Sequence, residues 1–220
     1  MIDCGALLFD LDGTLVDSTS VVERTWTAWS SMHGFDAAKV LAAAHGRRAL
    51  DTVRDFVPAG DLLSEVARLE ALELSELDAV VALPGARDTL AMLTDHQWAV
   101  VTSGSRRLAF GRLEACHLPR PSVLIGAEDV GRGKPDPEGY IAAALRLSIE
   151  PSDCIAFEDA PAGLKAASLA GCTVVGLTTT HRADQLTGNH THGLVPSLAS
   201  IRLARKDQRL HLTLRGSSMA

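Results

Sequence analysis

FDLDGTLVDS, residues 9–18, is the stretch from which the fold of this chain can be worked out. The apolar run GALLF leads directly into Asp10 and Asp12. A strand buried on both faces rarely ends in two ionised carboxylates unless they meet a cation or take part in a reaction. Gly13 allows a sharp turn after them, and Thr14 can hold that turn through a hydrogen bond. The same stretch also fits an ordinary capped turn, so its meaning depends on the ends of the other strands.

Further apolar runs predict the remaining strands of a sheet. Together with GALLF there are five such runs, at 5–9, 98–103, 122–127, 154–158 and 173–177. They are continuous rather than alternating, as in parallel strands that helices cover on both faces. Helical patterns lie between them, over 86–96, 105–116, 137–148 and 161–170. We therefore expect an α/β protein with a Rossmann-like parallel sheet, in which ligands bind beyond the carboxyl ends of the strands.

One long segment interrupts this alternation and is predicted to be helical. Its helical patterns cover 17–32, 37–44, 48–57 and 61–77. Because the segment is too long for a loop, we expect residues 17–83 to be a helical cap inserted into a discontinuous core of 1–16 and 84–210. Hinges would lie at 14–18 and 80–86. Helices packed directly on the sheet are the alternative, but strands would then be expected between them.

The end of the chain is expected to be less regular. Residues 208–214, QRLHLTL, have the pattern of a late edge strand. Residues 211–220 are expected to be a tail that is partly disordered or left over from cloning. NHTH at 189–192 contains two histidines, but its surroundings are polar, so we expect an exposed loop there rather than a metal site.

Composition and charge narrow the classes of function. Apolar residues make up 46% of the 220 and charged residues 22%, as in an ordinary globular protein. The formal net charge of −6 argues against nucleic acid or an anionic membrane as a partner. No apolar run is long enough for a membrane span and the acidic start is unlike a signal peptide, so a cytoplasmic protein is expected. The cysteines lack metal-site spacing and are expected to be buried thiols: Cys4, Cys116, Cys154 and Cys172.

Polar residues also follow other predicted strands. Thr102, Ser103 and Gly104 precede a helix, where hydroxyls and free N–H groups can hold an anion. The alternative is a simple helix N-cap. Lys134 lies before a helix start that prolines stiffen, and its charge can neutralise a phosphate or a group of carboxylates. An exposed loop lysine is the alternative here.

Glu158 and Asp159 end the strand at 154–158, and carboxylate oxygens are the ligands of a hard cation. Capping of the next helix by Asp159 would be the simpler explanation. However, the carboxyl ends of parallel strands meet along one edge of the sheet, so all these groups would lie together. An acidic group with one lysine and several hydroxyls predicts a site for Mg²⁺ and a phosphoryl group.

FDLDGTLVDS, VVTSGS, GKPDPEGY and FEDAPAG resemble, in this order, the four motifs of the haloacid dehalogenase superfamily of phosphohydrolases. The resemblance covers nearly the whole chain. HGRRALDTV at 45–53 and FEDAPAGLKAASLAGCTVVGLTT at 157–179 further resemble the helical-cap phosphatases of glycerol phosphate, 2-deoxyglucose 6-phosphate and hexitol phosphates. The cap helices after residue 57 resemble that subgroup much less.

The resemblance implies roles for the acidic residues. Asp10 would attack phosphorus and form an aspartyl-phosphate, which needs no separate base because a carboxylate is ionised at pH 7. Asp12 would protonate the leaving alkoxide and then act as base toward water. Mg²⁺ would be held by Asp10, the main-chain carbonyl of Asp12, Asp159 and Glu158.

The resemblance also implies which groups bind the phosphoryl oxygens. These would be Thr102, the N–H groups of Ser103 and Gly104, and the charge of Lys134.

The cap would decide which substrate is bound. His45, Gly46 and Arg48 match a pattern of the subgroup and would contact the sugar or polyol hydroxyls or the phosphate. Asp17 and Ser18, at the first hinge, could also reach the substrate. Alternatively, His45 packs inside the cap and the arginine is solvated.

The expected function is therefore that of a monomeric, Mg²⁺-dependent phosphatase of small phosphorylated sugars or polyols. A β-phosphoglucomutase-like phosphotransferase would use the same motifs and remains an alternative. A 2-haloacid dehalogenase would need neither Mg²⁺ nor Asp12, and a catalytically silent phosphate-binding module would not need the complete set of groups. The phosphate ester itself is not determined by the sequence.

Overall fold

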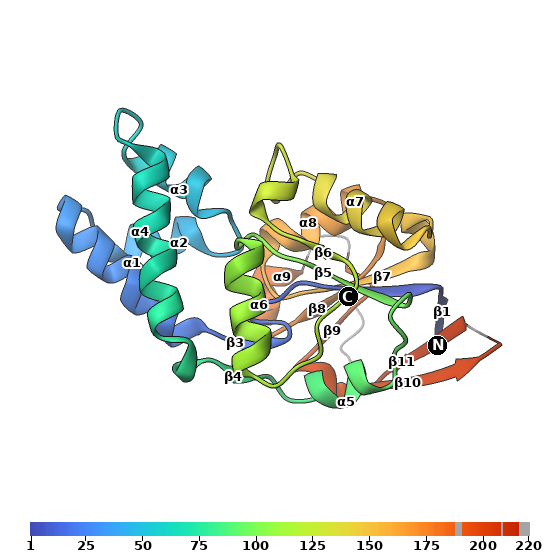
Figure 1. The fold of residues 1–220 in the computed structure, drawn as a ribbon. Helices are drawn as coiled ribbons and strands as arrows, with labels where there is room; N and C mark the ends of the chain where they lie inside the picture. Colours follow the sequence, from blue (N-terminus) through green and yellow to red (C-terminus); the bar gives the residue numbers. More distant parts are fainter. Residues whose placement is uncertain (188–190, 208, 216–220) are drawn as a thin grey trace.

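The structure is a computed structural model that describes residues 1–187, 191–207 and 209–215 of the chain. Figure 1 shows a sheet with helices on both sides and, beside it, a group of four helices formed by an early part of the chain.

A six-stranded parallel sheet forms the centre of the protein. From edge to edge its strands are β6 (Leu124–Ile125), β5 (Trp98–Val101), β2 (Ala6–Phe9), β7 (Cys154–Glu158), β8 (Thr173–Leu177) and β9 (Gly193–Val195). The five predicted strands and the α/β class are confirmed, and β9 is an additional strand. The chain runs outward from β2 to β6 and returns at β7 beside β2, so the order of the strands reverses at β2. Such a reversal is where sheets of this kind bind ligands.

Helices cover both faces of this sheet. Leu7 and Phe9 point into one cluster of buried side chains, whereas Ala6 and Leu8 point into the other, as the alternation along a strand requires. The first cluster includes side chains of α5 (Ala86–Ala91) and α6 (Arg106–Ala115). The second includes side chains of α7 (Glu138–Leu147), α8 (Pro161–Leu169) and α9 (Ala183–Leu186). Short 3₁₀ turns are η1 (Leu77–Ala79), η2 (Ala127–Asp129), η3 (Pro151–Asp153) and η4 (Leu198–Ser200).

Four helices form where the sequence predicts them between the first two strands of the core. They are α1 (Thr19–His33), α2 (Ala37–Ala44), α3 (Ala49–Phe56) and α4 (Leu62–Ser75). They pack around a cluster of their own that contains Trp26, Trp29, Val40 and Leu69. The two tryptophan rings meet edge to face with their centroids 5.5 Å apart.

A short two-stranded ladder joins the two ends of this helical segment. β3 (Val16–Asp17) pairs antiparallel with β4 (Val81–Ala82). No strand was predicted between Asp17 and Leu83. This ladder therefore corrects the prediction that the segment is purely helical. It lies within the predicted hinges and holds the two connections side by side.

A second, three-stranded sheet contains both ends of the described chain. β1 (Ile2–Cys4) and β10 (Ile201–Lys206) each pair antiparallel with β11 (Arg209–Leu214), which lies between them. The strand predicted over 208–214 is confirmed for residues 209–214, and Gln208 lies outside the described residues. The prediction that it is an edge strand is wrong.

The prediction that a tail begins at residue 211 is also wrong for residues 211–214. Leu210 and Leu212 are fully buried in the cluster that covers one face of the main sheet. Arg209 in addition pairs with the carboxylates of Asp3 and Asp153. Burial of apolar side chains therefore keeps this segment in the core.

The cysteines are buried thiols, as predicted. All four are free and buried. Burial raises the pKa of Cys4, Cys154 and Cys172 to about 12, so these three stay protonated at neutral pH.

The NHTH segment is described only in part. Asn189 and His190 lie outside the described residues. His192 is exposed, and its ring nitrogen Nδ1 accepts a hydrogen bond from the main-chain N–H of Val174 at 3.2 Å. The described half of the segment is thus hydrogen-bonded to β8.

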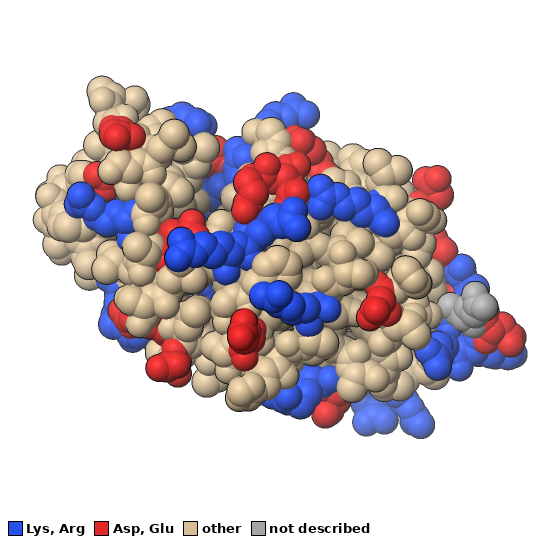
Figure 2. All heavy atoms as spheres, viewed as in Figure 1, with Lys and Arg blue, Asp and Glu red and all other residues tan. Residues whose placement is uncertain are grey.

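Charges of both signs are interspersed on the face of the molecule shown in Figure 2. This agrees with a modest net charge of −6. Within the described residues, no helix combines the length and the apolar character that crossing a membrane requires.

Replacement of Leu212 by alanine tests whether β11 belongs to the core. The side chain is fully buried, so Leu212→Ala should lower the free energy of unfolding by about 2–5 kcal/mol in urea titrations. The control is Leu145→Ala on α7, where the leucine is 75% exposed and the change should stay within about 0.5 kcal/mol. Equal effects of the two substitutions would contradict the placement of β11.

Candidate active site

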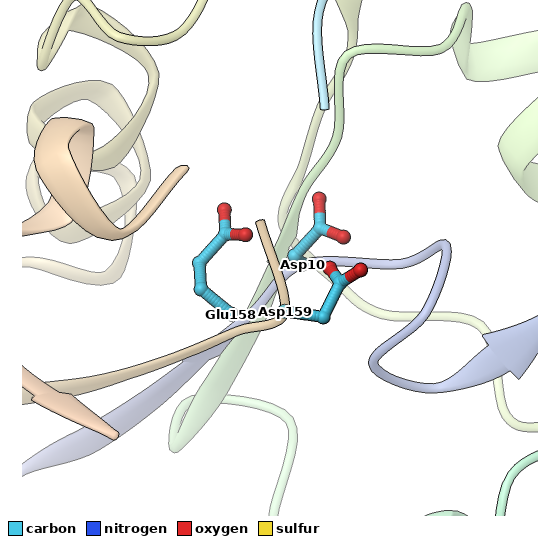
Figure 3. Close-up of side chains that lie close together, drawn as sticks. All are labelled: Asp10, Glu158 and Asp159. Atoms are coloured by element: carbon cyan, nitrogen blue, oxygen red, sulfur yellow. The ribbon is translucent and has the colours of Figure 1, made fainter. Parts of the chain in front are cut away.

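Three carboxylates meet at the carboxyl ends of β2 and β7. Asp10 follows β2 directly, Glu158 is the last residue of β7 and Asp159 comes next. Asp10 is held in line with the neighbouring strand by its N–H, which donates to the carbonyl of Phe157 at 3.0 Å. All three side chains are buried, and one oxygen of each lies within 4.8 Å of the others. Figure 3 shows the three side chains gathered at these two strand ends.

Among the residues that the structure describes, Lys134 is the cation that pairs with this cluster. Its Nζ donates to Asp10 Oδ1 and Glu158 Oε1, both at 2.5 Å, and to the carbonyl of Val101 at 3.0 Å. Burial lowers the pKa of Lys134, but the two carboxylates raise it by more, so the lysine remains charged. One lysine cannot balance three buried carboxylates.

Burial and the neighbouring negative charges raise the pKa values of two of these acids. Burial raises the pKa of Asp10, and the charge of Lys134 only partly opposes this. Burial, followed by the neighbouring Glu158, raises the pKa of Asp159 to about 7. A hard divalent cation bound by these oxygens would favour the ionised forms, so the donor set fits Mg²⁺.

Two glycines leave space for the carboxylates. A Cβ atom at Gly163 would lie 2.0 Å from Cδ of Glu158. A Cβ atom at Gly13 would lie 2.2 Å from Oδ2 of Asp159, and Gly13 also has a φ of +82°, which favours glycine. Larger residues at these positions would displace the two acids.

The predicted phosphate-binding segment lies beside this cluster. Thr102, Ser103 and Gly104 connect β5 to α6 and line the same cavity as Asp10. The hydroxyl of Thr102 accepts from the N–H of Gly104 at 3.0 Å, so this N–H is engaged within the loop. Ser105 caps α6, where its Oγ accepts from the N–H of Leu108 at 3.0 Å. The loop is thus ordered by its own hydrogen bonds.

The carboxylate of Asp12 points into the cavity and is held by two donors. Ser18 Oγ donates to its Oδ1 at 2.7 Å, and Nη1 of Arg112 donates to its Oδ2 at 2.6 Å. Arg112 also pairs with Glu73 of α4.

A cavity of about 200 Å³ lies above these groups. Its walls combine residues of the core, among them Asp10, Asp12 and Ser103, with residues of the four-helix segment, among them Trp26 and His45. The cavity therefore joins a charged floor to a partly apolar roof, as is common in small-molecule sites.

The predicted substrate residues do not all contribute polar groups to the cavity. His45, Gly46 and Arg48 line it, but the guanidinium of Arg48 donates to Asp51 and to the carbonyl of Val130 at 3.0 Å. It also donates to the carbonyl of Gly131 at 3.3 Å, so Arg48 bridges the helical segment and the loop before Lys134.

Asp17 does not contribute to the cavity wall as the structure describes it. Its Oδ1 accepts from the N–H of Thr19 at 3.0 Å, at the start of α1. The main-chain carbonyl of Gly46 accepts from Ser103 Oγ at 2.9 Å, which is another contact between the helical segment and the core.

Several residues around the site were not predicted. Tyr140 donates to Glu158 Oε1 at 2.5 Å, and Thr180 donates to Oδ2 of Asp159. Thr180 follows the strand at 173–177 in the stretch LTTT, so the rule that polar residues at strand ends form the site could have found it. Arg112 and Glu73 lie inside helical patterns, and no local signal distinguishes them from solvated charges.

Comparisons with known proteins agree with this geometry. Residues 4–171 match the family described as haloacid dehalogenase-like hydrolase. The chain is 43% identical over 179 residues to hexitol phosphatase A of Escherichia coli (strain K12), covering 79% of this chain and 83% of that protein. It is 34% identical over 224 aligned positions to 2-deoxyglucose-6-phosphate phosphatase 1 of Saccharomyces cerevisiae, covering 91% of each.

A solved structure shares the fold. The crystal structure of a hydrolase from Pseudomonas syringae superimposes with a TM-score of 0.77 at 24% identity, over 88% of this chain and 94% of that chain.

Replacement of Gly163 by alanine tests the carboxylate cluster. The added Cβ would collide with Glu158, so Gly163→Ala should weaken Mg²⁺ binding about 10- to 100-fold in calorimetric titrations. Gly131→Ala is the control, because a Cβ there would meet its nearest atom, Oε2 of Glu138, at 3.6 Å. If Gly163→Ala binds Mg²⁺ as the unmodified protein does, Glu158 is not a ligand.

Proposed function

Because the chain belongs to the haloacid dehalogenase-like hydrolases, we propose that it is a Mg²⁺-dependent phosphatase that hydrolyses small phosphorylated sugars or polyols through an aspartyl-phosphate. The observation that carries this proposal is the group of three buried carboxylates, Asp10, Glu158 and Asp159, of which Asp10 and Asp159 line the cavity. Relatives with names that refer to hexitol and 2-deoxyglucose 6-phosphate support the substrate class.

Asp10 is the proposed nucleophile. One of its oxygens is held by Lys134, which leaves the other oxygen to attack phosphorus. The new bond joins that oxygen to phosphorus while the bond from phosphorus to the substrate's ester oxygen breaks. Water then hydrolyses the aspartyl-phosphate and regenerates the carboxylate.

Asp12 is the proposed acid and base. Its carboxylate lines the cavity two residues after Asp10, so it can reach the leaving oxygen on the far side of phosphorus. It gives a proton to the leaving alkoxide and later takes one from the attacking water.

The metal site and the phosphate-binding loop would stabilise the charge of the transition state. Asp10, Glu158, Asp159 and the main-chain carbonyl of Asp12 would hold Mg²⁺, which reduces repulsion between the nucleophile and a phosphate dianion and stabilises the developing charge. Thr102, Ser103, Gly104 and Lys134 are the proposed donors to the phosphoryl oxygens. Binding of phosphate would require the N–H of Gly104 to exchange its bond to Thr102 for a bond to the substrate.

We propose that residues 17–83 act as a cap that opens to admit substrate. Contacts that hold it against the core in this structure include those from Arg48 to the carbonyls of Val130 and Gly131 and from Ser103 to Gly46. Each links the cap to a loop of the core that carries proposed phosphate-binding residues, so closure would order the cap and the site together. Trp26 and His45, on the roof, would contact the sugar or polyol.

A phosphate-release screen over hexitol phosphates, 2-deoxyglucose 6-phosphate and glycerol phosphates tests the reaction. We expect release in the presence of Mg²⁺, a loss of at least about 100-fold with EDTA, and recovery when Mg²⁺ is restored. Failure to release phosphate from any of these esters would contradict the proposal. Interconversion of sugar phosphate isomers without release would instead support a phosphotransferase.

Replacement of the nucleophile tests the role of Asp10. Asp10→Asn should lower kcat at least about 1,000-fold, since an amide oxygen is a poor nucleophile. The exposed Asp95 is the matched control, and Asp95→Asn should retain full activity. Thermal unfolding followed by circular dichroism would show that both variants are folded. Undiminished turnover of folded Asp10→Asn would remove Asp10 from this role.

A further inference from the structure

Arg112 is a buried arginine on the core side of the cavity. It lies on α6, the helix that follows the phosphate-binding loop, and its side chain is only 3% exposed. A buried guanidinium is costly unless carboxylates pair with it. Arg112 has two such partners, Asp12 in the core and Glu73 on α4, which its two outer nitrogens contact separately. The plane of the guanidinium is therefore fixed at both ends.

The contact with Arg112 completes the positioning of Asp12. Ser18 binds Oδ1 of this carboxylate and Arg112 binds Oδ2, so each oxygen has one donor. The side chain is still 28% exposed toward the cavity, where a leaving group would lie. A proton donor displaced by about 1 Å can lose about 100-fold in rate, so a second donor that prevents rotation is useful.

Glu73 makes this positioning depend on the helical segment. Its side chain is 10% exposed on the inner side of α4, and burial raises the pKa of Glu73 while Arg112 lowers it. α4 packs against α6, which brings the two side chains together. If α4 moved away, Arg112 would lose one of its two carboxylates.

We propose that Arg112 is a positioning residue for Asp12, and that Glu73 holds Arg112 in place when α1–α4 cover the cavity. The inference rests on the proposed function, because it assigns to Asp12 the transfer of a proton to the leaving alkoxide. It adds a link between cap and chemistry: the proton donor is fully aligned only while the cavity is closed and water is excluded.

The test compares two leaving groups. An alkoxide needs a proton from Asp12, whereas p-nitrophenolate leaves without one. Arg112→Met should therefore lower kcat/KM about 100-fold for the best alkyl phosphate from the screen, but less than about threefold for p-nitrophenyl phosphate. Arg107 is exposed on the same helix, and Arg107→Met is the control that should change neither value.

A double variant separates positioning from general damage. If Arg112 acts through Asp12, then Asp12→Asn combined with Arg112→Met should lower kcat/KM for the alkyl phosphate no further than Asp12→Asn alone. Losses that multiply, or an equal loss of both substrates in Arg112→Met, would overturn the inference.

Two milder variants keep the test informative if Arg112→Met does not fold. Arg112→Lys should recover part of the alkyl phosphate activity, and Glu73→Gln should lower it about 10-fold while sparing p-nitrophenyl phosphate. Glu23→Gln, at an exposed position of α1, is the control for Glu73. Full activity of Glu73→Gln on the alkyl phosphate would overturn the role of Glu73.

Failure of this inference and failure of the proposed function give different results. If the unmodified protein cleaves neither ester, the proposed function is wrong and the inference is wrong with it. If it cleaves both, and Arg112→Met loses both equally while remaining folded, only the inference is wrong.

Discussion

The imbalance between three buried carboxylates and one lysine is the constraint on which the rest of the structure depends. Asp10, Glu158 and Asp159 come from adjacent strand ends, and the parallel register of β2 and β7 brings them together whatever the charge. Uncompensated charge of this kind destabilises a fold unless something else binds there. The neighbouring residues partly compensate this charge. Glycines leave space for the carboxylates, and Lys134, Tyr140 and Thr180 donate hydrogen bonds to some of the carboxylate oxygens. A cation would satisfy the remainder.

The contacts between the helical segment and the core follow from the same arrangement. Three of them end on parts of the core that have proposed roles: Gly46 meets the phosphate-binding loop, Arg48 meets the loop before Lys134, and Glu73 meets the arginine that holds Asp12. Arg48 and Glu73 are buried charged side chains, and each also has a hydrogen-bond partner in the core. The position of the helical segment is therefore coupled to the geometry of the groups beneath it. In this structure all three contacts are formed.

Sequence reasoning identifies the main sheet and the clustered residues because their signals are local. A continuous apolar run predicts a buried strand, and a polar residue at its end or in the loop that follows indicates a functional group there. The second sheet could not be predicted in this way. Its strand β11 is stabilised by β1 and by Asp3, which lie at the opposite end of the chain. Leu210 and Leu212 alternate with polar residues and read as an edge, although the strand lies in the middle.

The contacts across the cavity could not be predicted from the sequence for a related reason. Arg112 and Glu73 are 39 residues apart on helices whose relative placement only the packed structure shows. Arg48 was expected to face the substrate because, with His45 and Gly46, it matches a family pattern. In the structure its guanidinium instead binds Asp51 and two loop carbonyls. Asp17 was expected to contact the substrate, but its carboxylate accepts a hydrogen bond from the N–H of Thr19 at the start of α1.

The central claim is that Asp10 carries the phosphoryl group, and trapping the intermediate tests it most directly. In Asp12→Asn, p-nitrophenyl phosphate can still phosphorylate the protein because its leaving group needs no proton, whereas hydrolysis of the intermediate is slowed for lack of a base. Mixing this variant with p-nitrophenyl phosphate and Mg²⁺ should give a burst of about one nitrophenol per protein molecule. Mass spectrometry after an acid quench should then find the phosphoryl group on Asp10. A burst that places it on another residue, or steady release without a burst or a phosphorylated protein, would contradict the account.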